Sequence, residues 1–208
     1  PTPAKLWAAR DVAGALAGIG TRRRRRGPVT EVVTDDVRLD RLPLLTSWPE
    51  DGGAFVTLPL VYTEHPERTG HNLGVYRLQR YDARTTDMHW QIGRGGGFHY
   101  AVAEAHDVPL PATVFLGGPP ALTLAAVAPL PENVPELMLA SLIAGRRLPV
   151  VDGLGPHRLI GDAEFALIGS VAPHERRVEG PFGDHYGYYS LRHDYPVFSI
   201  HRMAHRRD

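Results

Sequence analysis

Cysteine is the clearest absence in this sequence of 208 residues. Without it the chain cannot form disulfides, hold zinc through thiolates or use a thiol nucleophile. The charges also balance, with 23 Lys and Arg against 23 Asp and Glu, so no overall field attracts nucleic acid or an anionic membrane. No apolar run approaches the ~20 residues of a membrane helix. These absences predict a cytoplasmic globular protein that binds neither nucleic acid nor membrane.

Two common nucleotide-binding motifs are missing as well. No G-x-G-x-x-G lies between a predicted strand and a predicted helix, and no G-x-x-x-x-G-K-[ST] occurs. This excludes a dinucleotide-binding Rossmann fold and a phosphate-binding P-loop. The chain begins at Pro1 and ends soon after a predicted strand, which predicts a piece of a longer protein.

The sequence does contain short segments with strand-like and helix-like patterns. Residues 4–19 have helical spacing. The five arginines at 22–26 then predict a solvated, poorly ordered linker rather than a nucleic-acid contact, since net charge is zero. Runs of β-branched and aromatic residues predict strands at 55–63, 74–81, 87–92, 112–117, 164–172 and 195–203. Helices are predicted at 98–106, 120–127 and 135–144, the last between Pro135 and Gly145. The pattern favours an α+β fold with a mixed or antiparallel sheet.

Three clusters of residues could bind a ligand. Asn72 lies in a glycine-flanked turn five positions before Arg77, although alone the pair could be a turn and a surface charge. After Arg94, the glycines at 95–97 either present backbone N–H groups to an anion or form a plain hairpin loop. Glu136 lies in the first turn of a predicted helix, where the helix dipole favours a carboxylate by ~1 kcal/mol or less. It could also reach a metal shared with Asn72, because Mg²⁺ and Mn²⁺ prefer oxygen ligands.

The fourth cluster is "EGPFGDHYGYY", residues 179–189, which places Glu179 and Asp184 five positions apart among glycine and proline. Two acids in such a loop can differ in environment, one held ionised by an arginine and one with a raised pKa for proton transfer. Arg77 is the candidate partner of Glu179. The alternative is a turn in which the acids cap N–H groups and the tyrosines pack. We interpret the segment as a catalytic loop.

In this order the clusters resemble the UbiD-type decarboxylases, which use prenylated FMN. The resemblance runs from about Gly27 to the end of the chain and is carried by "HNLGVYRLQ", "MHWQIGRGGG", "PENVPELMLASLIAG" and "VEGPFGDHYGYY". It implies a split β-barrel flavin-binding domain with flanking helices over residues 27–208. Residues 1–26 would form an N-terminal helix and an arginine-rich linker, and the other domains of the family would be absent.

The resemblance also implies roles for individual residues. Asn72 and Glu136 match the ligands of a divalent metal, usually manganese, with potassium as a further ion. The matched cofactor contacts are Val75, Tyr76, Arg77, His89, Trp90, Gln91, Arg94 and Gly95. Relatives often have a further histidine ligand where this chain has Gly93. Either His89 or His99 takes its place, or the metal uses Asn72 and Glu136 with water.

The implied activity is reversible, non-oxidative decarboxylation of an aromatic or α,β-unsaturated acid, with the cofactor accepting the electrons that CO₂ leaves behind. Arg77, Glu179 and Asp184 match the catalytic network, in which Asp184, or else Glu179, donates the proton. The implied partners are a small carboxylic acid, a flavin prenyltransferase that supplies the cofactor, and further copies of the full-length chain. Two alternatives remain: an FMN-dependent reductase, which needs no such acids, and a non-catalytic or truncated flavin- or phosphate-binding module.

Overall fold

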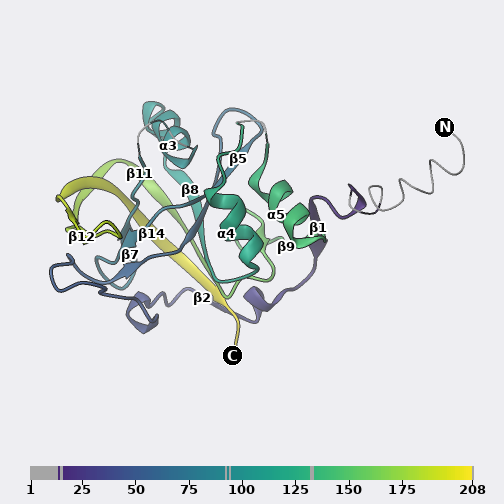
Figure 1. Ribbon diagram of the computed structural model, residues 1–208, viewed down its shortest axis with the longest axis horizontal. Coiled ribbons are helices and arrows are strands. Elements are labelled where there is room, and N and C mark those ends of the chain that lie inside the picture. Colours follow the sequence, from purple (N-terminus) through teal and green to yellow (C-terminus); the bar gives the residue numbers. More distant parts are fainter. Residues whose placement is uncertain (1–13, 15, 92, 94, 132–133, 208) are drawn as a thin grey trace, which may run out of the picture.

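The computed structural model describes residues 14, 16–91, 93, 95–131 and 134–207 (Figure 1). Most of the helix predicted at 4–19 lies outside these residues. The centre of the fold is a seven-stranded sheet in the order β2-β14-β11-β8-β4-β5, with β7 also paired to β14. All of its pairings are antiparallel. The strands are β2 (Val32–Thr34), β4 (Leu60–Glu64), β5 (His71–Val75), β7 (Thr85–Asp87), β8 (Leu110–Leu116), β11 (Phe165–Glu179) and β14 (His193–His205).

Strands β11 and β14 are much longer than the others, with 15 and 13 residues. Their register shifts at 168/169 and again at 171/176, and such bulges bend a strand pair. Figure 1 shows the pair sweeping away from the sheet and ending in a small hairpin, β12 (Phe182–Gly183) and β13 (Tyr189–Ser190). The sequence predicted only residues 164–172 of β11. Its second half is polar and mostly exposed, so it lacks the apolar alternation that identifies a strand.

The arginine run corrects one prediction. Thr21–Arg24 is not a loop but strand β1, which pairs in parallel with β9 (Leu148–Val151). Strand β10 (Leu159–Ile160) completes this three-stranded sheet. The arginines are exposed, as expected, and Arg23 Nε lies 3.6 Å from a carboxylate oxygen of Asp152. The backbone pairing with β9, rather than the side chains, orders the run.

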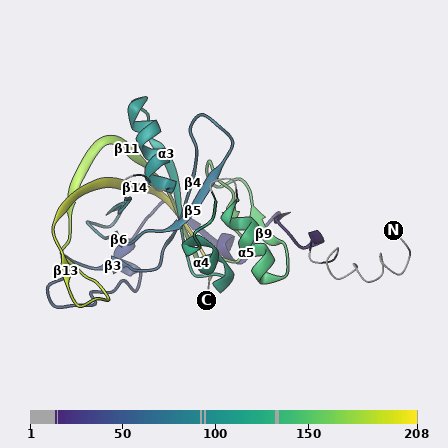
Figure 2. The ribbon, with the colours of Figure 1, turned by 45° about the horizontal axis from the view of Figure 1, so that its top comes forward.

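Three helices flank the sheet: α3 (Gly95–Ala105), α4 (Pro120–Val127) and α5 (Glu136–Ala144). Figures 1 and 2 place α4 and α5 together, and all three helices contact β5, while α3 also contacts β4, β8 and β11. Helix α5 has the predicted ends, Pro135 at its N-cap and Gly145 in the left-handed region at φ 64°. The glycines at 95–97 form the first turn of α3, so the hairpin-loop alternative is wrong. Two short 3₁₀ helices, Pro28–Thr30 and Leu39–Arg41, lie in the N-terminal half.

Three strands predicted from the sequence are longer than the strands that the structure contains. Residues 55–63 form β3 (Phe55–Val56) and β4, interrupted before Pro59, which has no N–H to donate. Residues 74–81 form the end of β5 and then β6 (Leu78–Gln79), with a break at 76–77. Residues 88–91 are not a strand, because the Trp90 N–H turns back to the Met88 carbonyl.

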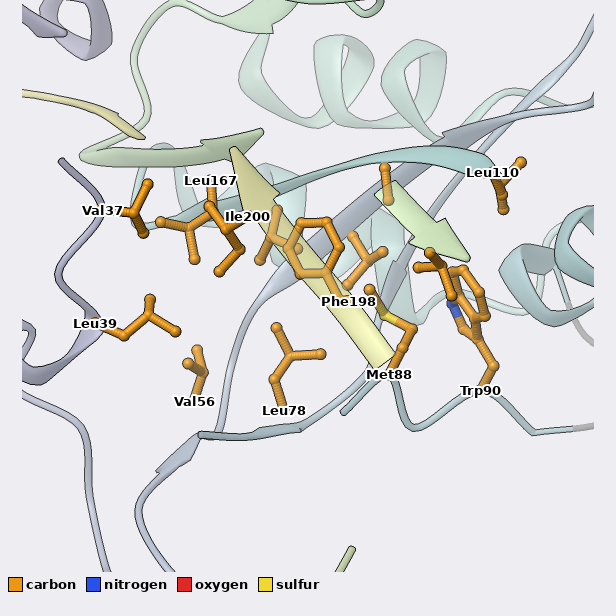
Figure 3. Packing of buried hydrophobic residues seen from close by; sticks show 14 of the residues in the cluster. Val37, Leu39, Val56, Leu78, Met88, Trp90, Leu110, Leu167, Phe198 and Ile200 are labelled. Atoms are coloured by element: carbon orange, nitrogen blue, oxygen red, sulfur yellow. The ribbon is translucent and has the colours of Figure 1, made fainter. Parts of the chain in front are cut away.

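The sheet separates two apolar clusters because neighbouring residues on a strand point to opposite faces. On β4 and β8, Val61 and Val114 enter the first cluster, whereas Leu60 and Phe115 enter the second, which α4 and α5 cover. Figure 3 shows the first cluster, in which Met88 and Trp90 pack with Phe198 and other labelled residues. The α+β prediction is confirmed. Among the described residues β5 does not pair back to β2, so barrel closure stays a prediction.

Gly169 offers a test of the β11–β14 pairing. A Cβ atom there would lie 2.1 Å from the Ser199 carbonyl oxygen, which belongs to the backbone of β14 and cannot move aside alone. We expect Gly169→Ala to lower the free energy of unfolding by about 1–3 kcal/mol, measured by urea denaturation. Ser170→Ala, on the next residue, removes only an exposed hydrogen bond with His201 and should cost about 0.5–1 kcal/mol. Equal stability of the two variants would contradict this packing.

Candidate functional site

A cavity of about 850 Å³ lies beside the edge strand β5. Its walls come from β5, the first turns of α3 and the segment that leads into α5. A volume of this size suits a ligand as large as a nucleotide cofactor. The predicted site residues that line it are Asn72, Val75, Tyr76, Arg77, His89, Gln91, Gly95 and Glu136. The structure therefore brings most of the predicted site residues together around one cavity.

At one end of the cavity, two side chains hold a buried carboxylate. Glu179, the last residue of β11, has no exposed surface. Arg77 Nε donates to its Oε1 at 2.9 Å, and His89 Nδ1 lies 2.9 Å from its Oε2. Burial would raise the pKa of Glu179, but the hydrogen bonds from His89 and Arg77 outweigh burial and keep that pKa below its ordinary value. Glu179 is therefore an anion at neutral pH, as the sequence predicted for the partner of Arg77.

Arg77 is also held from the side of the hairpin. Its guanidinium carbon lies 4.4 Å from the centre of the Phe182 ring, within cation–π range. Its Nη2 lies 3.3 Å from the Ser190 hydroxyl oxygen. The hairpin thus fixes the arginine in place even though its own acid, Asp184, does not contact Arg77.

Asp184 occupies the turn of this hairpin. Its Oδ1 accepts the Tyr186 N–H at 2.7 Å, and its own N–H donates to the Tyr188 carbonyl at 2.9 Å. Asp184 is half-buried and is not among the residues that line the cavity. The arrangement is the turn-capping alternative for this acid, so the structure joins Arg77 with Glu179 but leaves Asp184 apart.

One further predicted cofactor contact, Trp90, is not among the described residues that line the cavity. Trp90 is 5% exposed and packs in the first apolar cluster, where Figure 3 shows it beside Met88. The indole lies under α3, since a Cβ at Gly96 would meet its Nε1 at 2.5 Å. Arg94 lies outside the described residues.

Sequence reasoning missed Asp87, the last residue of β7. Its carboxyl group is fully buried. Oδ1 accepts the N–H of Gln79, and Oδ2 has no hydrogen-bond partner in the described part of the chain. Burial and the nearby charge of Glu179 raise the pKa of Asp87 well above its ordinary value. A lone acid within a predicted strand looks like a solvent-facing position, so no local signal could have identified it.

At the other end of the cavity, a second pair of polar atoms is buried without hydrogen-bond partners among the described residues. These are Glu136 Oε2 and His71 Nε2, which lie 3.9 Å apart. Burial raises the pKa of Glu136 and lowers that of His71, so the imidazole is neutral. His71 was not among the predicted site residues. The candidates for a further metal ligand are engaged elsewhere, His89 with Glu179 and His99 Nδ1 with the Thr63 hydroxyl at 2.9 Å.

Asn72, on the same strand, is packed against the start of α3. A Cβ at Gly95 would lie 1.8 Å from Asn72 Oδ1, so only glycine allows this approach. Asn72 Nδ2 donates to the Tyr76 hydroxyl at 3.3 Å, which leaves the amide oxygen available to a ligand. Asn72, Glu136 and His71 all line the cavity, and an amide oxygen, a carboxylate and a neutral imidazole are ligand types that a divalent metal accepts.

Sequence similarity identifies the family of this chain. The family model described as "3-octaprenyl-4-hydroxybenzoate carboxy-lyase Rift-related domain" (UbiD) matches residues 21–208. The chain belongs to this family. It is 51% identical over 209 residues to a Chlamydia pneumoniae protein named as a subunit of 4-hydroxybenzoate decarboxylase, covering all of this chain and 36% of that protein. The chain therefore spans about a third of the length of this relative.

Solved structures that are similar to this chain belong to the same family. The UbiD-class enzyme HmfF from Pelotomaculum thermopropionicum, in complex with prFMN, has a TM-score of 0.87 and 26% identity over 94% of this chain and 47% of its own. Vanillic acid decarboxylase from Sedimentibacter hydroxybenzoicus, in closed form, has a TM-score of 0.86 and 27% identity over 100% of this chain and 46% of its own. Among the described residues, no helix is both long and apolar enough to cross a membrane.

The buried ion pair predicts a pH-dependent stability. We expect Glu179→Gln to lower the free energy of unfolding by about 3 kcal/mol at neutral pH, because Arg77 is left without its anion. Since the folded-state pKa of Glu179 is lowered, its contribution is present above its unfolded pKa of about 4.3 and is lost as pH falls through the folded value. The deficit of the variant should therefore shrink in acid.

The matched control is Asp184→Asn, which removes the charge of an acid held only in its own turn. It should cost about 1 kcal/mol or less. Urea denaturation of both variants over a pH series measures the difference, and a deficit for Glu179→Gln that does not depend on pH would contradict the ionised pair.

Proposed function

We propose that this domain is the cofactor-binding part of a prenylated-FMN-dependent decarboxylase of aromatic or α,β-unsaturated carboxylic acids, which also runs in the carboxylating direction. Family membership and the prFMN complex of HmfF support this proposal, as do the aromatic acids in the names of two relatives. The observation that carries it is the buried Glu179, held by Arg77 and His89, two residues that line a cofactor-sized cavity.

The cavity offers a place for a flavin phosphate at the start of α3. Gly95, Gly96 and Gly97 form the first turn, where free N–H groups and the helix dipole favour an anion. The Gly96 N–H lies 3.4 Å from the Tyr76 hydroxyl, so Tyr76 borders the same place. Val75, Arg77 and Gln91 would then line the rest of the flavin. When bound, prenylated FMN supplies the sink for the electron pair that departing CO₂ leaves.

We propose that a divalent cation, manganese by resemblance, is held by Asn72 and Glu136, with His71 as an additional nitrogen ligand. Two buried polar atoms without partners among the described residues support this site, because unpaired buried groups are costly unless a ligand satisfies them. Manganese accepts both oxygen and imidazole ligands. Potassium, the other ion that the resemblance implies, has little affinity for imidazole, so it does not fit the Glu136–His71 pair.

Each charged residue has a defined task in this proposal. Arg77 orients Glu179 and presents positive charge at the cavity wall, where a substrate carboxylate can bind. Loss of CO₂ leaves a carbon that must take up one proton. Glu179, next to the wall, or Asp184, after movement of its hairpin, delivers that proton. In the whole protein, a flavin prenyltransferase supplies the cofactor and the chain forms homo-oligomers; an evolved form of HmfF is a dimer.

A non-catalytic flavin-binding module is the second candidate. It is favoured by the position of Asp184 in its own turn. Such a module binds cofactor and metal but releases no CO₂ when joined to the rest of its protein. A flavin reductase is disfavoured, because hydride transfer to FMN needs no buried pair like Arg77–Glu179.

The metal site predicts a selective loss of manganese. In the full-length protein, Asn72→Ala and Glu136→Gln should each weaken Mn²⁺ binding by about 10-fold or more, because each removes one ligand of a small set. Mn²⁺ titration followed by electron paramagnetic resonance gives the affinity. Glu104→Gln is the control, since this acid pairs with Arg176 on the far side of α3. Unchanged Mn²⁺ affinity in both ligand variants would exclude the site.

The catalytic assignment predicts loss of turnover without loss of cofactor. In the full-length protein loaded with prenylated FMN, Glu179→Gln should reduce CO₂ release by about 10²–10⁴-fold. The flavin absorbance should remain, because Glu179 does not line the cavity. CO₂ release is measured with a panel of aromatic and unsaturated acids. Normal turnover by this variant would exclude Glu179, and no turnover by the unchanged protein would favour the non-catalytic module.

A further inference from the structure

Two buried carboxyl groups share this site with a single arginine. Arg77 bonds to Glu179, whereas no Arg or Lys among the described residues bonds to Asp87. Both acids are 0% exposed. Burying a second, uncompensated anion costs several kcal/mol, so a proton is the simplest compensation. The cluster must therefore retain one proton beyond those of Arg77.

Three groups could hold this proton. One carboxylate oxygen each from Asp87 and Glu179 and one ring nitrogen of His89 lie within 4.8 Å of one another. That separation is short enough for one water molecule to bridge. The proton resides either on Asp87, beside a neutral imidazole, or on His89, between two carboxylates. Because Glu179 already accepts from Arg77 and His89, Asp87 is the member whose free oxygen, Oδ2, has nothing among the described residues to stabilise a charge.

The other titratable groups near Asp87 do not change the net charge of this cluster. Tyr81 and Tyr195 both interact electrostatically with Asp87, and burial raises the pKa of each, so both are neutral at working pH. A divalent metal is the other possible occupant of the three ligand atoms. Arg77 disfavours it, because its guanidinium already lies 2.9 Å from Glu179 and would repel a second cation.

We propose that Asp87 is the proton reservoir of this site: its buried carboxyl group holds the proton that replaces CO₂ and passes it through His89 to Glu179, which delivers it to the carbon. This inference rests on the proposed decarboxylase function. His89 lines the cavity, and its bond to Glu179 stabilises the imidazolium that forms during transfer. The substrate carboxylate loses CO₂, the electron pair left on carbon takes this one proton, and solvent water returns a proton to Asp87. Asp87 acts through His89 and is thus a positioning residue.

The direct test needs no substrate. In the full-length protein with ¹³C-carboxyl-labelled aspartate, infrared spectra recorded from about pH 5 to pH 9 should show the C=O stretch of one protonated aspartate at neutral pH. Asp87→Asn should abolish this band and Asp184→Asn should leave it. The inference is overturned if the unchanged protein has no such band, or if the band survives in Asp87→Asn. Loss of the band on adding Mn²⁺ alone would identify a metal site instead.

The second test is kinetic. With prenylated FMN bound, turnover of the unchanged protein should fall at alkaline pH as Asp87 loses its proton. Asp87→Asn should lower turnover by about 10²-fold and remove that alkaline limb, and Asp87→Glu should restore both. An alkaline limb that persists in Asp87→Asn would overturn the reservoir.

The two hypotheses fail separately. If the labelled band behaves as expected but no acid is decarboxylated, the proposed function is wrong and the stored proton remains. If the protein decarboxylates without the band, the reservoir is wrong and the function stands. Should Asp87→Asn fail to fold, the band of the unchanged protein still decides whether a protonated aspartate exists.

Discussion

The site is organised around the buried pair of Arg77 and Glu179. A carboxylate with no exposed surface is stable as an anion only if hydrogen bonds and a cation replace the water it loses. Arg77 and His89 supply them from two separate segments, one at the break between β5 and β6 and one after β7. Glu179, at the far end of β11, is therefore connected to the edge of the sheet through Arg77 and to the segment of the first apolar cluster through His89. The pair also determines the charge state of Asp87, because the arginine can neutralise only one of the two acids.

Strand β5 places the two ends of the cavity at a defined separation. It carries His71 and Asn72 at one end, and Arg77 follows its last residue by two positions. As an edge strand it has a free side, toward which α5 brings Glu136 and α3 brings its first turn. Gly95 allows the approach of Asn72, and the Tyr76 hydroxyl contacts both Asn72 and the Gly96 N–H. Two close-packed contacts, rather than a long loop, thus hold the first turn of α3 against the strand.

Much of this arrangement could be predicted from local sequence. The ends of α5 followed from Pro135 and Gly145, and Arg77 was correctly expected as the partner of Glu179. The second half of β11 could not be predicted, because a polar ribbon that extends from the sheet has no apolar alternation. Asp87 and His71 were missed for a related reason. Asp87 is buried by the pairing of β7 with β14 and His71 faces Glu136 of α5, elements distant in sequence, so the residue type alone suggests an exposed position.

Trp90 and Asp184 show the limit of reasoning from motifs. Both lie within the segments that carry the family resemblance, yet Trp90 packs in the core and Asp184 caps a turn. A residue in such a segment can support the site by packing against the residues that line it, without contacting a ligand itself. Trp90 supports the first turn of α3 from below, since its indole fills the space that a side chain at Gly96 would need. The hairpin that contains Asp184 contributes Phe182 and Ser190 to Arg77. Trp90 thus helps to position the glycine turn of α3, and the hairpin that contains Asp184 helps to position Arg77. The binding of a charged ligand would depend on both features.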